Sequence, residues 1–282
     1  MRQLPANRMR CVELAQLPCI TRASELARGN SPGGARGLNR RKIGVSIRIA
    51  VILAGGLGLR LRPLTNIIPK PLLPIGESTI LEIQILSLRR HGVKDVIIAA
   101  NYMSDYLKSV VGDGEKYGGV RVHISEEKQP LGTCGPLTLV SDRLVEPFVV
   151  MNGDILTNLD FSKLGEFALS RPAWLTIVTK EIAIPFRFGR VIAEGDRIVD
   201  IEEKPNFLQE ILAGIYVMRP EILRLIPSST YFGIDTLIKT MLTENHAINK
   251  YLTKDYWVDI GQLGDYEQAK EHYDRIGQNF NA

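Results

Sequence analysis

The 282-residue sequence has few of the features that mark a membrane protein, a disulfide-rich secreted domain or a metal centre built on histidine and cysteine. No run approaches the roughly 20 apolar residues that a membrane span needs. The three cysteines, Cys11, Cys19 and Cys134, are widely separated and share no redox or metal-ligand spacing, and the four histidines are isolated as well. These absences favour a reducing compartment, so we expect a cytoplasmic protein that does not enter a membrane.

The net charge of +4 gives no reason to expect nucleic-acid binding. Residues 1–42 hold nine Lys and Arg against two acids, Glu13 and Glu25. Removing these from the 35 basic and 31 acidic residues of the whole chain leaves 26 and 29, so the remainder is slightly acidic. The positive charge is therefore a property of the N-terminal segment and not of the main body.

Residues 1–46 are expected to form a disordered basic extension, because they lack sustained apolar periodicity and include the Gly- and Arg-rich stretch RGNSPGGARGLNRRK. The segment has no apolar core of the kind found in signal peptides. An Arg-rich organelle transit peptide and a mis-assigned start codon both remain open explanations.

From Ile47 onward, short apolar runs alternate with amphipathic stretches, as βαβ units require. We expect an α/β fold over residues 47–282, a Rossmann-like three-layer sandwich with a mostly parallel mixed sheet and a smaller β subregion. Strands are predicted over 47–53, 94–101, 120–127 and 146–152, and a helix capped by Ser78 and Thr79 is predicted to end near Arg90. A helix is also predicted to begin near Cys134, another to follow Pro220, and a final helix to span 263–275. The stretch FGRVIAEGDRIVDIEEKP (188–205) is predicted to form a hairpin that turns at Glu194, Gly195 and Asp196.

A glycine-rich loop follows the first strand. Gly55, Gly56 and Gly58 let backbone N–H groups approach a phosphate, and Arg60 and Lys70 are two cations within reach. The spacing matches neither the dinucleotide fingerprint nor a Walker A loop. Taken alone, such a loop is more often only a tight turn than a phosphate site.

The loop and six motifs that follow it in order resemble the signature of the sugar-1-phosphate nucleotidyltransferases, also called NDP-sugar pyrophosphorylases. The motifs are GGLGLRLRPLT (55–65), PKPLLPIG (69–76), LGTCGPL (131–137), MNGDIL (151–156), IEEKP (201–205), AGIYVM (213–218) and YWVDIG (256–261). The loop LGTCGPL is most similar to the mannose-1-phosphate guanylyltransferase type. The resemblance covers about residues 48–275.

The resemblance implies an enzyme of the EC 2.7.7 class that joins a sugar 1-phosphate to a nucleoside triphosphate, releasing pyrophosphate, in NDP-sugar synthesis for cell-surface polysaccharide. Because both reactants are anions, such a site needs cations and Mg²⁺ more than a protein nucleophile. The implied catalytic residues are Arg60, Lys70 and Lys204. Asp154 and Asp259 are implied to share the Mg²⁺, although Asp154 taken without this context is more often a turn or capping residue.

The resemblance also implies the two substrate sites. The nucleotide-binding residues expected from it are Leu53, Ala54, Gly55, Gly56, Gly58, Gln129, Gly132 and Thr133. The sugar-binding residues expected from it are Gly189, Glu203, Lys204 and Ala213, in the smaller β subregion.

Two alternatives stay open at this point. GTP is the favoured nucleotide, with UTP or dTTP and glucose 1-phosphate as the alternative pair. Leu59, Phe188 and Leu212 stand where relatives commonly carry polar residues, and these departures are also compatible with a non-catalytic sugar-nucleotide-binding regulatory subunit. The expected partners are the two substrates, with neither nucleic acid nor membrane, and a homo-oligomer is compatible with the sequence.

Overall fold

The computed structural model describes residues 46–101 and 103–281, with side chains described as far as Tyr273. The expected basic extension, apart from its last residue Ser46, lies outside the described residues. No helix among these described residues is both long and apolar enough to cross a membrane.

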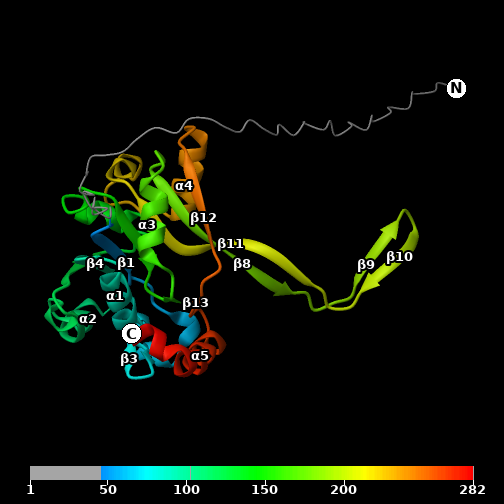
Figure 1. Ribbon diagram of the computed structural model, residues 1–282, viewed down its shortest axis with the longest axis horizontal. Helices are drawn as coiled ribbons and strands as arrows, with labels where there is room; N and C mark the ends of the chain where they lie inside the picture. The colour runs from blue at the N-terminus through cyan, green and yellow to red at the C-terminus, as the bar shows by residue number, and fades with distance from the viewer. Residues whose placement is uncertain (1–45, 102, 282) are drawn as a thin grey trace, which may run out of the picture. The chain divides into compact units, whose positions relative to one another are not determined.

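A seven-stranded mixed sheet forms the centre of the fold, as the alternating pattern predicts (Figure 1). Its strands are β1 (Ile49–Leu53), β4 (Asp95–Ala100), β5 (Arg121–Glu126), β6 (Phe148–Asn152), β8 (Leu175–Pro185), β11 (Asn206–Met218) and β12 (Ile248–Thr253). Their order is β12-β8-β11-β6-β1-β4-β5. β11 runs antiparallel to both of its neighbours, and the other neighbouring pairs are parallel. The α/β, mostly parallel fold class is confirmed.

Helices cover both faces of this sheet, because alternate strand residues point to opposite sides. The helices are α1 (Ile80–Arg90), α2 (Ser104–Val111), α3 (Phe161–Leu169), α4 (Ile234–Thr243) and α5 (Leu263–Asn281). The 3₁₀ helices are η1 (Leu59–Leu61), η2 (Leu64–Asn66), η3 (Lys70–Leu72), η4 (Glu115–Tyr117), η5 (Gly135–Val140) and η6 (Pro220–Leu225). One face of β1 packs against α1, α2 and α3, and the other packs against η5, η6 and α4.

The start of α1 follows the predicted capping box. The Thr79 hydroxyl accepts a hydrogen bond from Glu82 N at 3.1 Å, and Glu82 Oε2 accepts one from Thr79 N at 3.0 Å. Two of the helix's free N–H groups are thereby satisfied, which fixes where α1 begins.

Two predicted helices are wrong in type and one in length. The segment after Cys134 and the segment beginning at Pro220 are the 3₁₀ helices η5 and η6. Each is only six residues long. So short a segment can form too few i→i−4 hydrogen bonds to offset the cost of starting an α-helix. α5 extends to Asn281, beyond the predicted end.

Three two-stranded sheets accompany the central one. They are formed by β2 (Pro74–Ile75) with β3 (Ser78–Thr79), by β7 (Ile155–Thr157) with β13 (Trp257–Asp259), and by β9 (Arg190–Glu194) with β10 (Arg197–Glu202). A third apolar cluster joins β7 and α5, with Leu156, Tyr266 and Ala269 buried in it.

β8 and β11 continue beyond the central sheet as a two-stranded ribbon that ends in the β9–β10 hairpin (Figure 1). The strands are buried as far as Thr179 and Ala213 and mostly exposed beyond them. The hairpin turns at Glu194, Gly195 and Asp196, where the sequence predicts it. We call residues 181–211 the ribbon.

Candidate functional site

An open cleft of about 320 Å³ lies at the carboxyl ends of the strands. Parallel α/β sheets bind ligands at this edge. We call it the glycine-loop cleft; it is lined by Leu53, Gly55, Gly56, Glu127, Pro130, Leu131, Gly132, Thr133, Asn152, Asp154 and Tyr231. A smaller hollow of about 40 Å³ adjoins it and adds Ala54, Lys70, Pro71 and Gly153.

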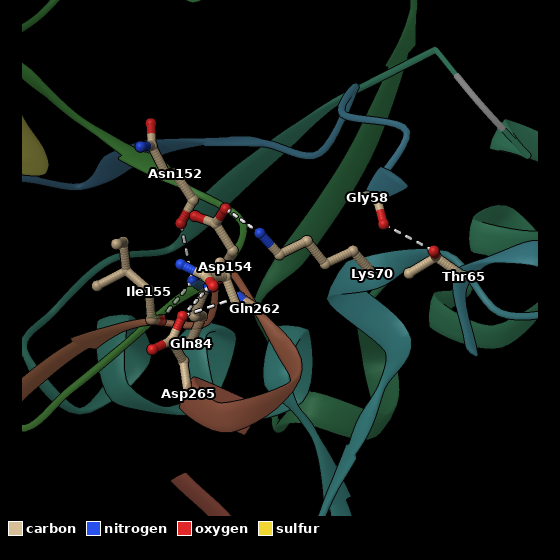
Figure 2. Close-up of polar contacts among 10 residues, drawn as sticks. Gly58, Thr65, Lys70, Gln84, Asn152, Asp154, Ile155, Gln262 and Asp265 are labelled. Carbon is tan, nitrogen blue, oxygen red and sulfur yellow. Dashed lines mark hydrogen bonds and ion pairs between the residues drawn. The ribbon is translucent and has the colours of Figure 1, made fainter. Parts of the chain in front are cut away.

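The glycine loop can take its path only because side chains are absent. A Cβ on Gly55 would lie 2.9 Å from Glu127 Oε1. Gly58 has a φ of +60°, and its carbonyl accepts a hydrogen bond from Thr65 Oγ1 at 2.8 Å (Figure 2). The loop is therefore held against the following segment, with Gly55 and Gly56 facing the cleft.

Asp154 lies in the turn between β6 and β7, at the floor of the cleft. Its Oδ2 accepts a hydrogen bond from Lys70 Nζ at 2.5 Å, and both side chains are largely buried (Figure 2). The turn lies against the end of β1, since a Cβ on Gly153 would lie only 2.8 Å from the Leu53 carbonyl oxygen. Lys70, predicted as a phosphate-binding and catalytic cation, is thus also the counter-ion of Asp154.

Asp259 reaches the same place from near the end of the chain. β13 pairs antiparallel with β7, which sets Asp259 opposite Ile155, and Ile260 N donates to the Asp154 carbonyl at 3.0 Å. Burial, together with the negative charge of Asp154, raises the pKa of the Asp259 carboxyl. The structure therefore brings together the two aspartates that the sequence separates by more than a hundred residues.

The residues at this point fit a divalent cation. Oδ1 of Asp154 and Oδ1 of Asp259 are both buried and have no hydrogen-bond partner. Among the described residues no cluster of three or more His, Cys, Asp or Glu side chains could hold a metal. Two carboxylates are nevertheless enough for Mg²⁺, which commonly takes one or two protein carboxylates and completes its shell with water and substrate phosphates.

Arg60 lies beside the loop that follows Asp259. A Cβ on Gly261 would lie 3.4 Å from Arg60 Nη2 and 3.4 Å from Asp265 Oδ2. Asp265, at the start of α5, accepts hydrogen bonds from Gly261 N at 3.1 Å and Gln262 N at 2.8 Å (Figure 2). Asp265 thus holds the loop after Asp259 through two backbone N–H groups. The positive charge of the neighbouring Arg60 guanidinium favours the ionised form of Asp259.

The lining of the cleft also contains two of the predicted nucleotide-binding residues, Gly132 and Thr133. Gly132 has a φ of +77°, and a Cβ there would lie 2.8 Å from the Phe232 carbonyl oxygen. The Thr133 hydroxyl accepts a hydrogen bond from Ile234 N at 2.7 Å, so it is engaged at the start of α4. Gln129 is exposed and donates to Ser229 O at 3.2 Å, outside the cleft lining.

Sequence reasoning missed Glu127, a buried carboxylate in the wall of the cleft. Burial raises the pKa of its carboxyl, and a hydrogen bond from Leu131 N at 3.1 Å partly offsets this. An acid directly after a predicted strand, at its carboxyl end, was the available signal. Asn152 and Tyr231, which also line the cleft, had no comparable signal.

The predicted sugar-binding residues fall into two separate places. Ala213 is buried near the cleft, where its carbonyl accepts a hydrogen bond from Trp257 Nε1 at 2.8 Å. Gly189, Glu203 and Lys204 lie together in the outer part of the ribbon, at the base of the β9–β10 hairpin, with Lys204 69% exposed and its Nζ 3.8 Å from Glu203 Oε1. About 23 Å of strand separates Asn206 from Ala213, so the structure does not bring these three residues to the cleft.

Known proteins resemble this chain over most of the described region. Residues 49–275 match the family model described as "Nucleotidyl transferase". The chain is 34% identical over 228 residues to "Probable mannose-1-phosphate guanylyltransferase 1" of Oryza sativa subsp. japonica. It is 37% identical over 227 residues to "Mannose-1-phosphate guanylyltransferase catalytic subunit beta" of Danio rerio. Each alignment covers 77% of this chain and 62% of the relative, so the chain spans less than two thirds of the length of these relatives.

A solved structure shares both fold and sequence with the chain. The crystal structure of HddC from Yersinia pseudotuberculosis complexed with GMP-PN superimposes with a TM-score of 0.63 at 29% identity, covering 80% of this chain and 100% of that one. The family match extends over the glycine loop, Lys70, and both aspartates of the cleft. The chain therefore belongs to the nucleotidyl transferase family.

Proposed function

We propose that this chain transfers a nucleotidyl group from a nucleoside triphosphate to a sugar 1-phosphate, producing an NDP-sugar and pyrophosphate. The observation that carries the proposal is the pairing of β7 with β13. It places Asp154 and Asp259 side by side, next to Lys70, at the floor of a cleft whose rim is a glycine loop.

The chemistry follows from the charges. The sugar phosphate oxygen attacks the α-phosphorus in line, and the bond from that phosphorus to the pyrophosphate oxygen breaks. Lys70 and Arg60 offset the negative charge of the two phosphates, and the backbone N–H groups of Gly55 and Gly56 hold the triphosphate. Mg²⁺, held by Asp154 and Asp259, supplies further charge neutralisation when bound.

GTP is the proposed nucleotide, and a mannose-, heptose- or glucosamine-like 1-phosphate is the proposed acceptor. The names of the two curated relatives and the GMP-PN in the HddC structure support this preference. Gly132 and Thr133 are proposed to border the base, with Glu127 beside them as a hydrogen-bond acceptor or donor according to its protonation. UTP or dTTP with glucose 1-phosphate remains the alternative pair.

Lys204 and Glu203 are proposed to bind the phosphate and hydroxyl groups of the sugar 1-phosphate, with Gly189 and Ala213. For this role the ribbon has to bend so that its hairpin approaches the cleft. The present distance favours one competing function, a sugar-nucleotide-binding regulatory subunit that keeps the cleft but does not complete the reaction.

A cytoplasmic location is also proposed, supported by the scarcity of cysteine. Self-association of the chain into a homo-oligomer is also proposed.

A pyrophosphate-release assay tests the function. The four common nucleoside triphosphates are each combined with a panel of sugar 1-phosphates, in Mg²⁺ and in EDTA. We expect release with GTP in Mg²⁺ and none in EDTA. Binding of NDP-sugar without release from any pair would support the regulatory subunit instead.

A further inference from the structure

Gln84 is a buried polar residue on the inward face of α1. Its side chain is only 3% exposed, and Nε2 donates hydrogen bonds to the carbonyl oxygens of Asn152 at 2.9 Å and Ile155 at 2.8 Å (Figure 2). Both partners are acceptors, so the amide nitrogen, and not the oxygen, has to face them. The orientation of this side chain is therefore determined by its surroundings.

The two carbonyls that Gln84 binds bracket Asp154. The rest of the turn is held from other elements, since Gly153 N donates to Leu53 O at 2.9 Å and the Asp154 carbonyl accepts from Ile260 N at 3.0 Å. β1 and β13 thus hold the middle of the turn, and α1 holds both of its ends through one side chain. This arrangement fixes the backbone of Asp154, and so the point from which its side chain starts, relative to Asp259.

Packing alone does not account for an amide at this position. Gln84 Oε1 is buried and has no hydrogen-bond partner, which is unfavourable. An apolar side chain of the same length would avoid that cost, but it would remove the donor for both carbonyls. The side chain is therefore better explained by the turn than by the core around it.

We propose that Gln84 is a positioning residue that fixes the turn between β6 and β7 so that Asp154 and Asp259 face a common cation. The inference rests on the proposed function for its consequence in catalysis. Its structural part, the holding of the turn, can be measured in the metal-free protein.

The test replaces Gln84 by methionine, which has a similar length and no donor. In the full chain we expect Mn²⁺ affinity, measured by electron paramagnetic resonance titration, to fall about 10-fold, as is usual when a residue that orients a metal ligand is lost. The Mg²⁺ concentration needed for half-maximal activity should rise by a similar factor, and excess Mg²⁺ should restore the rate. Amide hydrogen exchange at residues 153–155 should accelerate without metal.

The matched control is Ile85→Val, a conservative change at the neighbouring buried position of the same helix. It should lower the melting temperature while leaving Mn²⁺ affinity and exchange in the turn unchanged. Q84M with wild-type Mn²⁺ affinity and wild-type exchange would overturn the proposal. A wild-type chain that binds Mn²⁺ but releases no pyrophosphate would count against the proposed function only, because the exchange and affinity comparisons would still decide the role of Gln84.

Discussion

Single residues in the cleft are arranged for charge, at a cost to the folded protein. Asp259 is buried beside Asp154, and both effects raise the pKa of its carboxyl above the ordinary value of 3.8. The folded state consequently binds a proton here more tightly than the unfolded chain does. Stability from this group is lost as the pH rises from about 4 through the raised pKa.

Replacing Asp259 by asparagine should therefore raise the melting temperature of the metal-free protein at pH 7 by a few degrees. The gain should disappear below pH 4, where the wild-type carboxyl is protonated in both states. Pyrophosphate release should be lost in the same variant. Calorimetry across pH 3.5–8 in EDTA measures the first effect, and a destabilised D259N at pH 7 would contradict this account.

Lys70 is in direct contact with Asp154, and its charge also acts on Asp259, so its loss should act on the reaction itself. We expect Lys70→Ala to reduce kcat by about 10²–10³, the usual effect of removing one preorganised charged or donor group at a developing charge. Steady-state kinetics with saturating Mg²⁺ measures the loss. Lys239→Ala, which removes an exposed lysine of α4 from an i,i+4 ion pair, should leave kcat unchanged.

At the scale of elements, the sequence predicted those features that neighbouring residues determine, such as a helix start or a tight turn. The capping box of Thr79 and Glu82 and the hairpin at Gly195 are both found where the sequence places them. The pairing of β7 with β13 has no local signature, because both strands are three residues long and lie a hundred residues apart. The length of the β8–β11 ribbon was likewise not predictable, since few of its side chains are buried.

The ribbon contributes little to the core, so its outer part should be removable. Joining Ile184 to Phe207 through an Asn-Gly turn, which suits a two-residue hairpin, should leave the melting temperature and GTP binding nearly unchanged. Sugar 1-phosphate turnover should be lost with the hairpin. Thermal melting, GTP titration and the pyrophosphate assay measure the three quantities.

A point variant separates the hairpin from its lysine. Lys204→Ala should raise the apparent KM for the sugar 1-phosphate at least 10-fold without changing GTP affinity, because one charge-assisted contact to phosphate is lost. An unchanged KM in K204A would reject the role assigned to Lys204. Arg197→Ala, at an exposed position of the same hairpin, serves as the control.

At the scale of the whole molecule, the sequence located the cleft through the strand ends. The glycine loop after β1 and Asp154 after β6 follow apolar strands whose carboxyl ends share one edge of the sheet, and this much follows from the pattern. Gln84 acts through hydrogen bonds to residues about 70 positions away, and such contacts are visible only once the elements are packed. The position of Lys204 depends on how far the ribbon bends, which its pattern of residues does not determine.

Metal binding should stabilise the whole fold, because the two carboxylates repel each other less with a cation between them. At a Mg²⁺ concentration about 100 times its Kd, the free energy of unfolding should rise by about 2.7 kcal/mol, which is a shift of about 5 °C or more in a domain of this size. Thermal melting in Mg²⁺ and in EDTA measures the shift. D259N should show almost none, and an equal shift in both proteins would exclude this metal site.

The antiparallel pairing of β7 with β13 also has a consequence for the order of events during synthesis. A nascent chain acquires the glycine loop and Lys70 first and then Asp154, whereas Asp259 is added only after more than a hundred further residues. Any translation product that stops before Asp259 has most of a phosphate cradle and half of its cation ligands. Completion of the centre is thus tied to synthesis of the chain as far as Asp259, so that shorter fragments capable of holding nucleotide would remain inert.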